Sequence, residues 1–120
     1  MTVIRWLVVL SVTLVMLQAV SAGISLSGYV VGATIHKAVA PALQVATLVQ
    51  VTIAVVQWRR GRVPGWVAGF SLGLFAIVFL QTGFGYRRWF WLHVPIGVGI
   101  FSGLARLASM LRVPNVRVPS

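Results

Sequence analysis

The sequence predicts an all-α integral membrane protein, folded as a four-helix bundle made of two repeated helical hairpins. Hydrophobic side chains make up 59% of the 120 residues, charged ones only 8%, and the mean hydropathy is +0.99. The apolar residues gather in four stretches, each close to the roughly 20 residues that cross a hydrocarbon core. Because little chain lies outside them, we expect a single domain over residues 1–120.

The four predicted spans cover about residues 4–26, 30–58, 66–82 and 89–111. The breaks between them are marked by Gly28 with neighbouring serines, by an arginine run ending in Pro64-Gly65, and by Gly83 and Gly85 before two arginines. These connections are short, so consecutive spans should pack antiparallel.

The first span also fits a secretory signal peptide. Arg5 precedes its apolar run, and Val20-Ser21-Ala22 matches the small-residue rule for cleavage. With Met1 present, we expect this segment to be retained as a span. The other three spans have the same orientation in either case.

The ten charged residues are all Lys or Arg, and their distribution predicts the orientation. The side of the N-terminus carries Arg5, Arg59, Arg60, Arg62, Arg106, Arg112 and Arg117, and the opposite side carries Lys37, Arg87 and Arg88. The positive-inside rule then places both termini in the cytoplasm, for a multi-pass protein of the plasma membrane. Anionic lipid accounts for the basic tail, so we expect the bilayer as partner and no nucleic acid.

The residue types that are missing exclude much chemistry. Without Asp or Glu the chain has no paired-acid hydrolysis, no Ser-His-Asp triad and no carboxylate-held Mg²⁺ or Ca²⁺. Without Cys it has no thiolate site. His36 and His93 are its only histidines and its best candidates for metal ligands.

The two histidines occupy corresponding places in a repeated pattern. Leu17-Gln18 is followed by a loop, His36 and then Pro41, and Leu80-Gln81 is followed by a shorter loop, His93 and then Pro95. Spans two and four run in the same direction, so both imidazoles should lie at similar depth. Taken singly, each histidine also fits an interfacial residue that bonds a neighbouring helix or water.

A bis-His haem b fits this predicted arrangement, since neutral imidazole is a good axial ligand for iron and bundle cores hold haem. Iron would be bound by His36 and His93. Lys37, Arg87 and Arg88 would pair with the haem propionates. Gly97, one turn beyond His93, would leave room for the macrocycle.

Helical phase indicates which faces point inward. In span two, small or polar residues at nearly every turn form a stripe predicted to face the interior: His36, Ala40, Leu43, Thr47, Gln50, Ala54 and Gln57. In span four the His93 stripe lies opposite a stripe of Pro95, Gly99, Ser102 and Arg106, and the sequence leaves the inward face open.

Small residues at four-residue spacing predict close helix packing. They form ladders at Gly65, Gly69 and Gly73 and at Ala38, Ala42 and Ala46. They also support the alternative function, a small accessory or assembly subunit that packs against a larger membrane complex without a cofactor.

The order of these residues resembles one four-helix half of the haem A synthase family of integral membrane proteins. The resemblance rests on Gln18-x4-Gly23, a histidine on span two, a basic loop, Leu80-Gln81-x3-Gly85 and His93-x-Pro95-x-Gly97. It implies that His36 and His93 are haem ligands, in a chain that acts as one bundle or as a homodimer. A larger respiratory or membrane complex is the other partner that we expect. Ala33 stands where the catalytic half of that family has a carboxylate, which leaves open whether this chain is an oxidoreductase.

Overall fold

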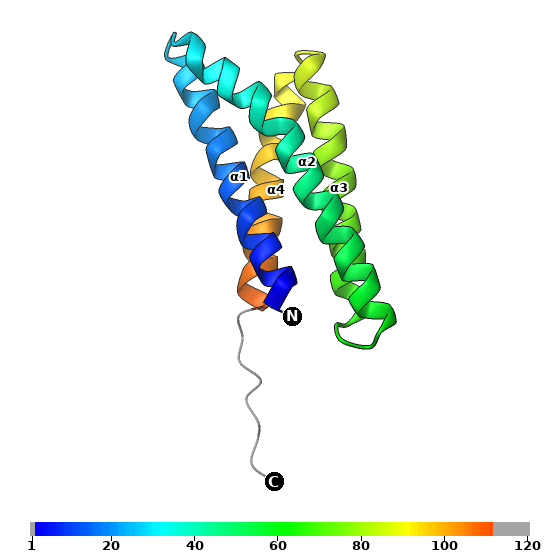
Figure 1. Cartoon of the computed structure of the whole chain (residues 1–120). Helices are drawn as coiled ribbons and strands as arrows, with labels where there is room; N and C mark the ends of the chain where they lie inside the picture. Colours follow the sequence, from blue (N-terminus) through cyan, green and yellow to red (C-terminus); the bar gives the residue numbers. More distant parts are fainter. Residues whose placement is uncertain (1, 112–120) are drawn as a thin grey trace.

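The computed structural model describes residues 2–111 and shows four α-helices (Figure 1). They are α1 (Thr2–Leu26), α2 (Val30–Arg59), α3 (Gly65–Tyr86) and α4 (Phe90–Met110). All four are long and apolar enough to cross a membrane, and the described residues contain no strand. The predicted all-α class with four long apolar helices is therefore confirmed.

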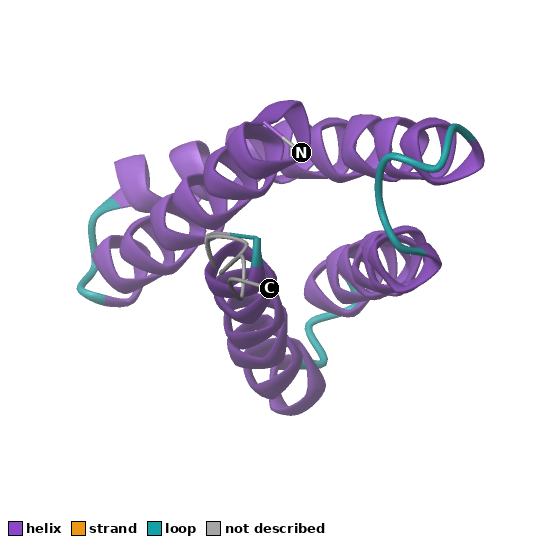
Figure 2. Cartoon of the chain, turned by 90° about the horizontal axis from the view of Figure 1, so that it is seen from below, coloured by secondary structure: helices purple, strands orange, loops and turns teal. Residues whose placement is uncertain are grey.

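The helices form an antiparallel ring, in which each helix packs against two neighbours (Figure 2). α1 contacts α2 and α4, and α3 contacts α2 and α4. α2 and α4 face each other across the diagonal, with no Cα atoms within 8 Å of each other. The start of α1, the end of α4 and the α2–α3 loop lie at one end of the bundle, and both hairpin loops lie at the other (Figure 1).

α3 is longer than predicted. It continues through Gly83 and Gly85 and ends at Tyr86, because glycine alone does not end a membrane helix in which every backbone bond must be satisfied internally. The turn comes at the arginine pair instead. Arg88 has a φ of 60°, a left-handed conformation that reverses the chain into α4.

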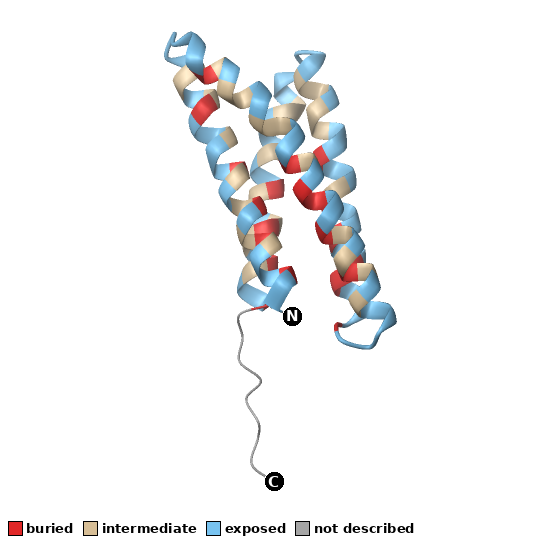
Figure 3. Ribbon diagram, viewed as in Figure 1, coloured by how far each residue is buried: buried red, intermediate tan, exposed pale blue. Residues whose placement is uncertain are grey.

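Buried residues are spread along the bundle (Figure 3), and they include both apolar and polar side chains. At its middle, Ser11 of α1 donates to Gln50 Oε1 at 3.4 Å, and Gln50 Nε2 donates to Ser71 Oγ of α3 at 3.1 Å. All three side chains are fully buried. The predicted inward stripe of α2 is confirmed, because its members are buried or half-buried.

The tertiary structure also decides the inward face of α4. Ile100, Leu104 and Leu107 are buried, on the same stripe as His93, and the opposite stripe, which includes Gly99 and Arg106, is exposed. His93, a candidate ligand of the cofactor, therefore lies on the interior side of α4.

In the predicted ladder of α3, Gly65 packs against α2, because a Cβ added there would lie 2.9 Å from Nε1 of Trp58, but the other two glycines do not pack inside this bundle. A Cβ added at Gly69 or Gly73 would meet nothing within 4 Å, and both residues are exposed. A close approach of two helices is made elsewhere, at Gly32, where an added Cβ would lie 2.6 Å from the carbonyl oxygen of Ser21. Gly32 therefore allows α2 to lie directly against the backbone of α1.

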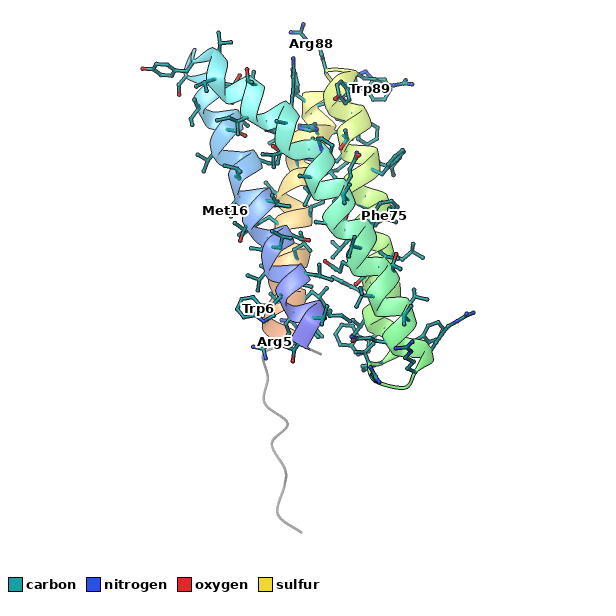
Figure 4. All side chains as sticks on the ribbon, in the orientation of Figure 1. Arg5, Trp6, Met16, Phe75, Arg88 and Trp89 are labelled. Carbon is teal, nitrogen blue, oxygen red and sulfur yellow. The ribbon has the colours of Figure 1, made fainter. Side chains whose placement is uncertain are left out.

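The cations separate along the bundle (Figure 4). Arg5 lies near the start of α1, at the same end as Arg59, the last residue of α2, and as Arg60 and Arg62 in the α2–α3 loop. Arg88 lies at the opposite end. The predicted positions Arg112 and Arg117 fall outside the described residues.

Candidate functional site

His36 lies in the second turn of α2, half-buried against α1. Its Nδ1 atom is 2.9 Å from the backbone carbonyl oxygen of Gln18. The same nitrogen lies 3.3 Å from the hydroxyl of Ser21, which itself donates to the Gln18 carbonyl at 3.1 Å. The imidazole and the serine hydroxyl of the first hairpin thus share one carbonyl acceptor.

His93 lies in the first turn of α4, half-buried against α3. Its Nδ1 atom is 2.8 Å from the carbonyl oxygen of Gln81, which repeats the contact of the first hairpin. The Gln81 side chain returns a bond, since its Nε2 donates to the carbonyl oxygen of His93 at 3.2 Å. Gly85 is in contact with the ring, because a Cβ added there would lie 2.8 Å from Cε1 of His93.

The two imidazoles meet across the diagonal of the bundle. Their ring centroids are 6.1 Å apart and the ring planes are inclined by 66°. Since α2 and α4 have no close backbone contact, these side chains reach toward each other between two helices that are otherwise separate. The structure thus brings together the two residues that the repeat singles out.

The hydrogen bonds of both rings favour one tautomer. A backbone carbonyl can only accept, so Nδ1 of each histidine carries the proton and donates it. Nε2 then carries the lone pair of the neutral ring, which is the form that binds a metal. Metal-bound histidines commonly have this second contact, which orients the ring and raises its basicity.

The three cations predicted for the site are exposed. Lys37 follows His36 in α2, and Arg87 and Arg88 form the turn before α4. The Arg87 guanidinium lies over the indole ring of Trp89, 5.5 Å from its centroid, and Arg88 extends beyond the helix ends (Figure 4). These positive charges lie at the end of the bundle that holds the histidines.

The space beside Gly97 is occupied by the side chain of Gln81. A Cβ added there would lie 2.7 Å from Nε2 of Gln81, so the missing side chain accommodates the amide that bonds His93. Ala33, one turn before His36, is half-buried.

Gln18, Gln81, Ser21 and Gly85 contact the histidines and were not predicted as site residues. The two glutamines were detectable in principle, because they hold the same position in both copies of the repeat. Their contact is made by backbone carbonyls, however, and a sequence pattern carries no information on which carbonyl faces an imidazole.

A hollow of about 450 Å³ lies elsewhere. It is open to the outside and lies between α1 and α4 toward the termini, lined by Val9, Val12, Thr13, Ala105, Ala108 and Ser109. None of the predicted site residues contributes to it.

Comparisons with protein families, with curated proteins and with solved structures gave no match.

Proposed function

We propose that this chain binds haem b within the membrane, with His36 and His93 as its two axial ligands, and serves electron transfer or haem handling. The observation that carries the proposal is the pair of half-buried imidazoles, 6.1 Å apart between their centroids, each with Nδ1 held by a backbone carbonyl. The resemblance to one half of the haem A synthase family points in the same direction.

The separation of the rings fits a metal held between them. Bonds from a transition metal to imidazole nitrogen are about 2 Å long, and with about 1 Å from each nitrogen to its ring centre the centroids would be roughly 6 Å apart. The described residues hold no group of three or more His, Cys, Asp or Glu suited to a metal ion. Haem needs no such group, because its own ring supplies four of the ligands.

The exposed cations would hold the carboxylates of the ligand. Lys37, Arg87 and Arg88 lie at the end of the bundle that holds the two histidines. The chain has no acidic residue that competes for these cations. Charge-assisted bonds of this kind are among the stronger ones in proteins. Gly97 would act indirectly, since it gives Gln81 the space to hold His93.

When bound, the group would supply one-electron redox chemistry, and a site with both axial positions filled favours electron transfer over oxygen activation. The chain's own contribution is to orient the two imidazoles, whose Nδ1–H groups donate to the carbonyls of Gln18 and Gln81, and to limit the access of water. With Ala33 in place of a carboxylate, we assign no catalytic residue.

The test is a reduced-minus-oxidised absorption spectrum of the purified protein after expression with ample haem. We expect a low-spin b-type spectrum, which His36→Ala and His93→Ala each weaken or abolish. Thr34→Val is the matched control, because the Thr34 hydroxyl is exposed and bonds only the carbonyl of Val30 in its own helix. A wild-type protein that folds and takes up no haem would refute the proposal.

One observation favours a second candidate, the cofactor-free accessory subunit. Gly69 and Gly73 lie on an exposed face of α3 with open space beside them, and none of the four described helices covers it. Such spacing lets two membrane helices approach closely, in a homodimer or a larger complex. In this case Gly69→Ile with Gly73→Ile would abolish cross-linking to the partner, and His93→Ala would leave assembly unchanged.

For localisation we propose the plasma membrane, with both termini in the cytoplasm. The cations near the termini and in the α2–α3 loop support this orientation.

A further inference from the structure

The second hairpin holds its histidine with several contacts. Gln81 and His93 exchange two hydrogen bonds, one from the imidazole to a carbonyl and one from the amide to a carbonyl. The ring also touches Gly85 and meets the edge of Phe90, with centroids 6.5 Å apart. His93 is therefore restrained at both its backbone and its ring.

The first hairpin lacks the returning bond. Four residues after His93 stands Gly97, where a Cβ would lie 2.7 Å from the Gln81 amide, and four residues after His36 stands Ala40, which carries a Cβ. Consistently, no bond joins the Gln18 amide to the His36 carbonyl among the described contacts. Gln18 Oε1 is instead buried without a hydrogen-bond partner in the part of the chain that the structure describes.

The helix segment that carries His36 also differs in its direction. Each histidine is followed by a proline inside its helix, Pro41 in α2 and Pro95 in α4, and each proline removes a backbone hydrogen bond. The part of α2 before Pro41 leans with α1 away from the α3–α4 loop (Figure 1). The carbonyl that holds the His36 ring is shared with Ser21, whereas Gln81 offers its carbonyl to His93 alone among the described side-chain contacts.

We propose that His36 is the exchangeable ligand and His93 the fixed one, so that a small uncharged diatomic molecule can take the place of His36. This inference rests on the proposed haem function. The exchange breaks the bond from Nε2 of His36 and forms one to the incoming molecule, with no change of oxidation state. The Nδ1 proton stays on the imidazole.

The first experiment exposes the reduced, haem-loaded protein to carbon monoxide and follows the absorption spectrum. We expect the wild type to bind carbon monoxide, His36→Gly to keep its haem and bind at least tenfold faster, and His93→Gly to lose most of its haem. Added imidazole should restore haem to His93→Gly, which shows that this variant is folded. Equal loss of haem in both variants, or no binding by the wild type, would overturn the inference.

The second experiment exchanges the two residues that distinguish the hairpins. Ala40→Gly gives the Gln18 amide room to bond the His36 carbonyl, and should slow carbon monoxide binding about fivefold, the effect of one ordinary hydrogen bond. Gly97→Ala displaces the Gln81 amide and should speed the loss of haem by a similar factor. Unchanged rates in both variants would contradict the inference that His93 is restrained more strongly than His36.

The two proposals can fail separately. A folded wild type that takes up no haem refutes the proposed function and this inference with it. A wild type that shows a bis-His spectrum, with two histidines that respond identically, refutes only the inference.

Discussion

Gln81 and His93 are joined by two hydrogen bonds that run in opposite directions between α3 and α4. Nδ1 of His93 donates to the Gln81 carbonyl at 2.8 Å, and Nε2 of Gln81 donates to the His93 carbonyl at 3.2 Å. The side-chain amide of Gln81 can lie close to α4 because Gly97 has no side chain. The pair therefore links the stability of the second hairpin to the orientation of a candidate ligand.

Gly97→Ala should destabilise the bundle. A methyl group 2.7 Å from the Gln81 amide forces that side chain away, and overpacking of this kind costs about 1–3 kcal/mol. The free energy of unfolding in mixed detergent micelles measures the effect. Gly99→Ala is the control, because its added Cβ meets nothing within 4 Å, and it should be neutral or slightly stabilising. Equal stability of the two variants would contradict the described packing.

Gly32→Ala should separate α1 from α2. The added Cβ would lie 2.6 Å from the Ser21 carbonyl oxygen and would also meet the backbone of Ser25, so the helices must move apart at a cost of about 1–3 kcal/mol. Disulfide trapping between cysteines introduced into the two helices reports their separation. Gly23→Ala, with open space beside it, should leave trapping unchanged. Trapping as efficient in Gly32→Ala as in the wild type would count against the close approach.

Gln50→Leu should weaken the centre of the bundle. It removes the bonds to Ser11 and Ser71, and interhelical bonds in membranes contribute about 0.6 kcal/mol each, so a loss of about 1 kcal/mol is expected. Unfolding in the presence of increasing denaturing detergent measures this loss. Thr52→Val removes an exposed hydroxyl that bonds only within its own helix, and should have no effect. A Gln50→Leu variant as stable as Thr52→Val would show that the buried bonds contribute little.

Single cysteines should report the proposed orientation, because the natural chain has none to interfere. A membrane-impermeant maleimide added to intact cells should label Ser27→Cys in the α1–α2 loop. Arg60→Cys, in the α2–α3 loop, should react only after lysis. The reverse pattern would place the termini outside.

Much of the fold could be predicted, because the bilayer restricts a chain to few solutions. Four apolar stretches with short connections predict four antiparallel helices, and the polar stripe through Thr47 and Gln50 predicts the inward face of α2. The end of α3 was predicted four residues too early. The prediction placed the turn at Gly83 and Gly85 because glycine is frequent in turns, but both residues lie inside the helix.

The candidate site, like the fold, could be predicted from the sequence only in part. The amino-acid sequence by itself determined four helices long and apolar enough to cross a membrane, the uneven distribution of the cations and the two histidines of the repeat as candidate ligands. Only the tertiary structure decided that α4 turns His93 inward, that the two rings lie 6.1 Å apart, and that Gly97 makes room for Gln81. The physical reason is that hydropathy depends on residue type alone, whereas helix rotation and carbonyl contacts depend on how neighbouring helices pack.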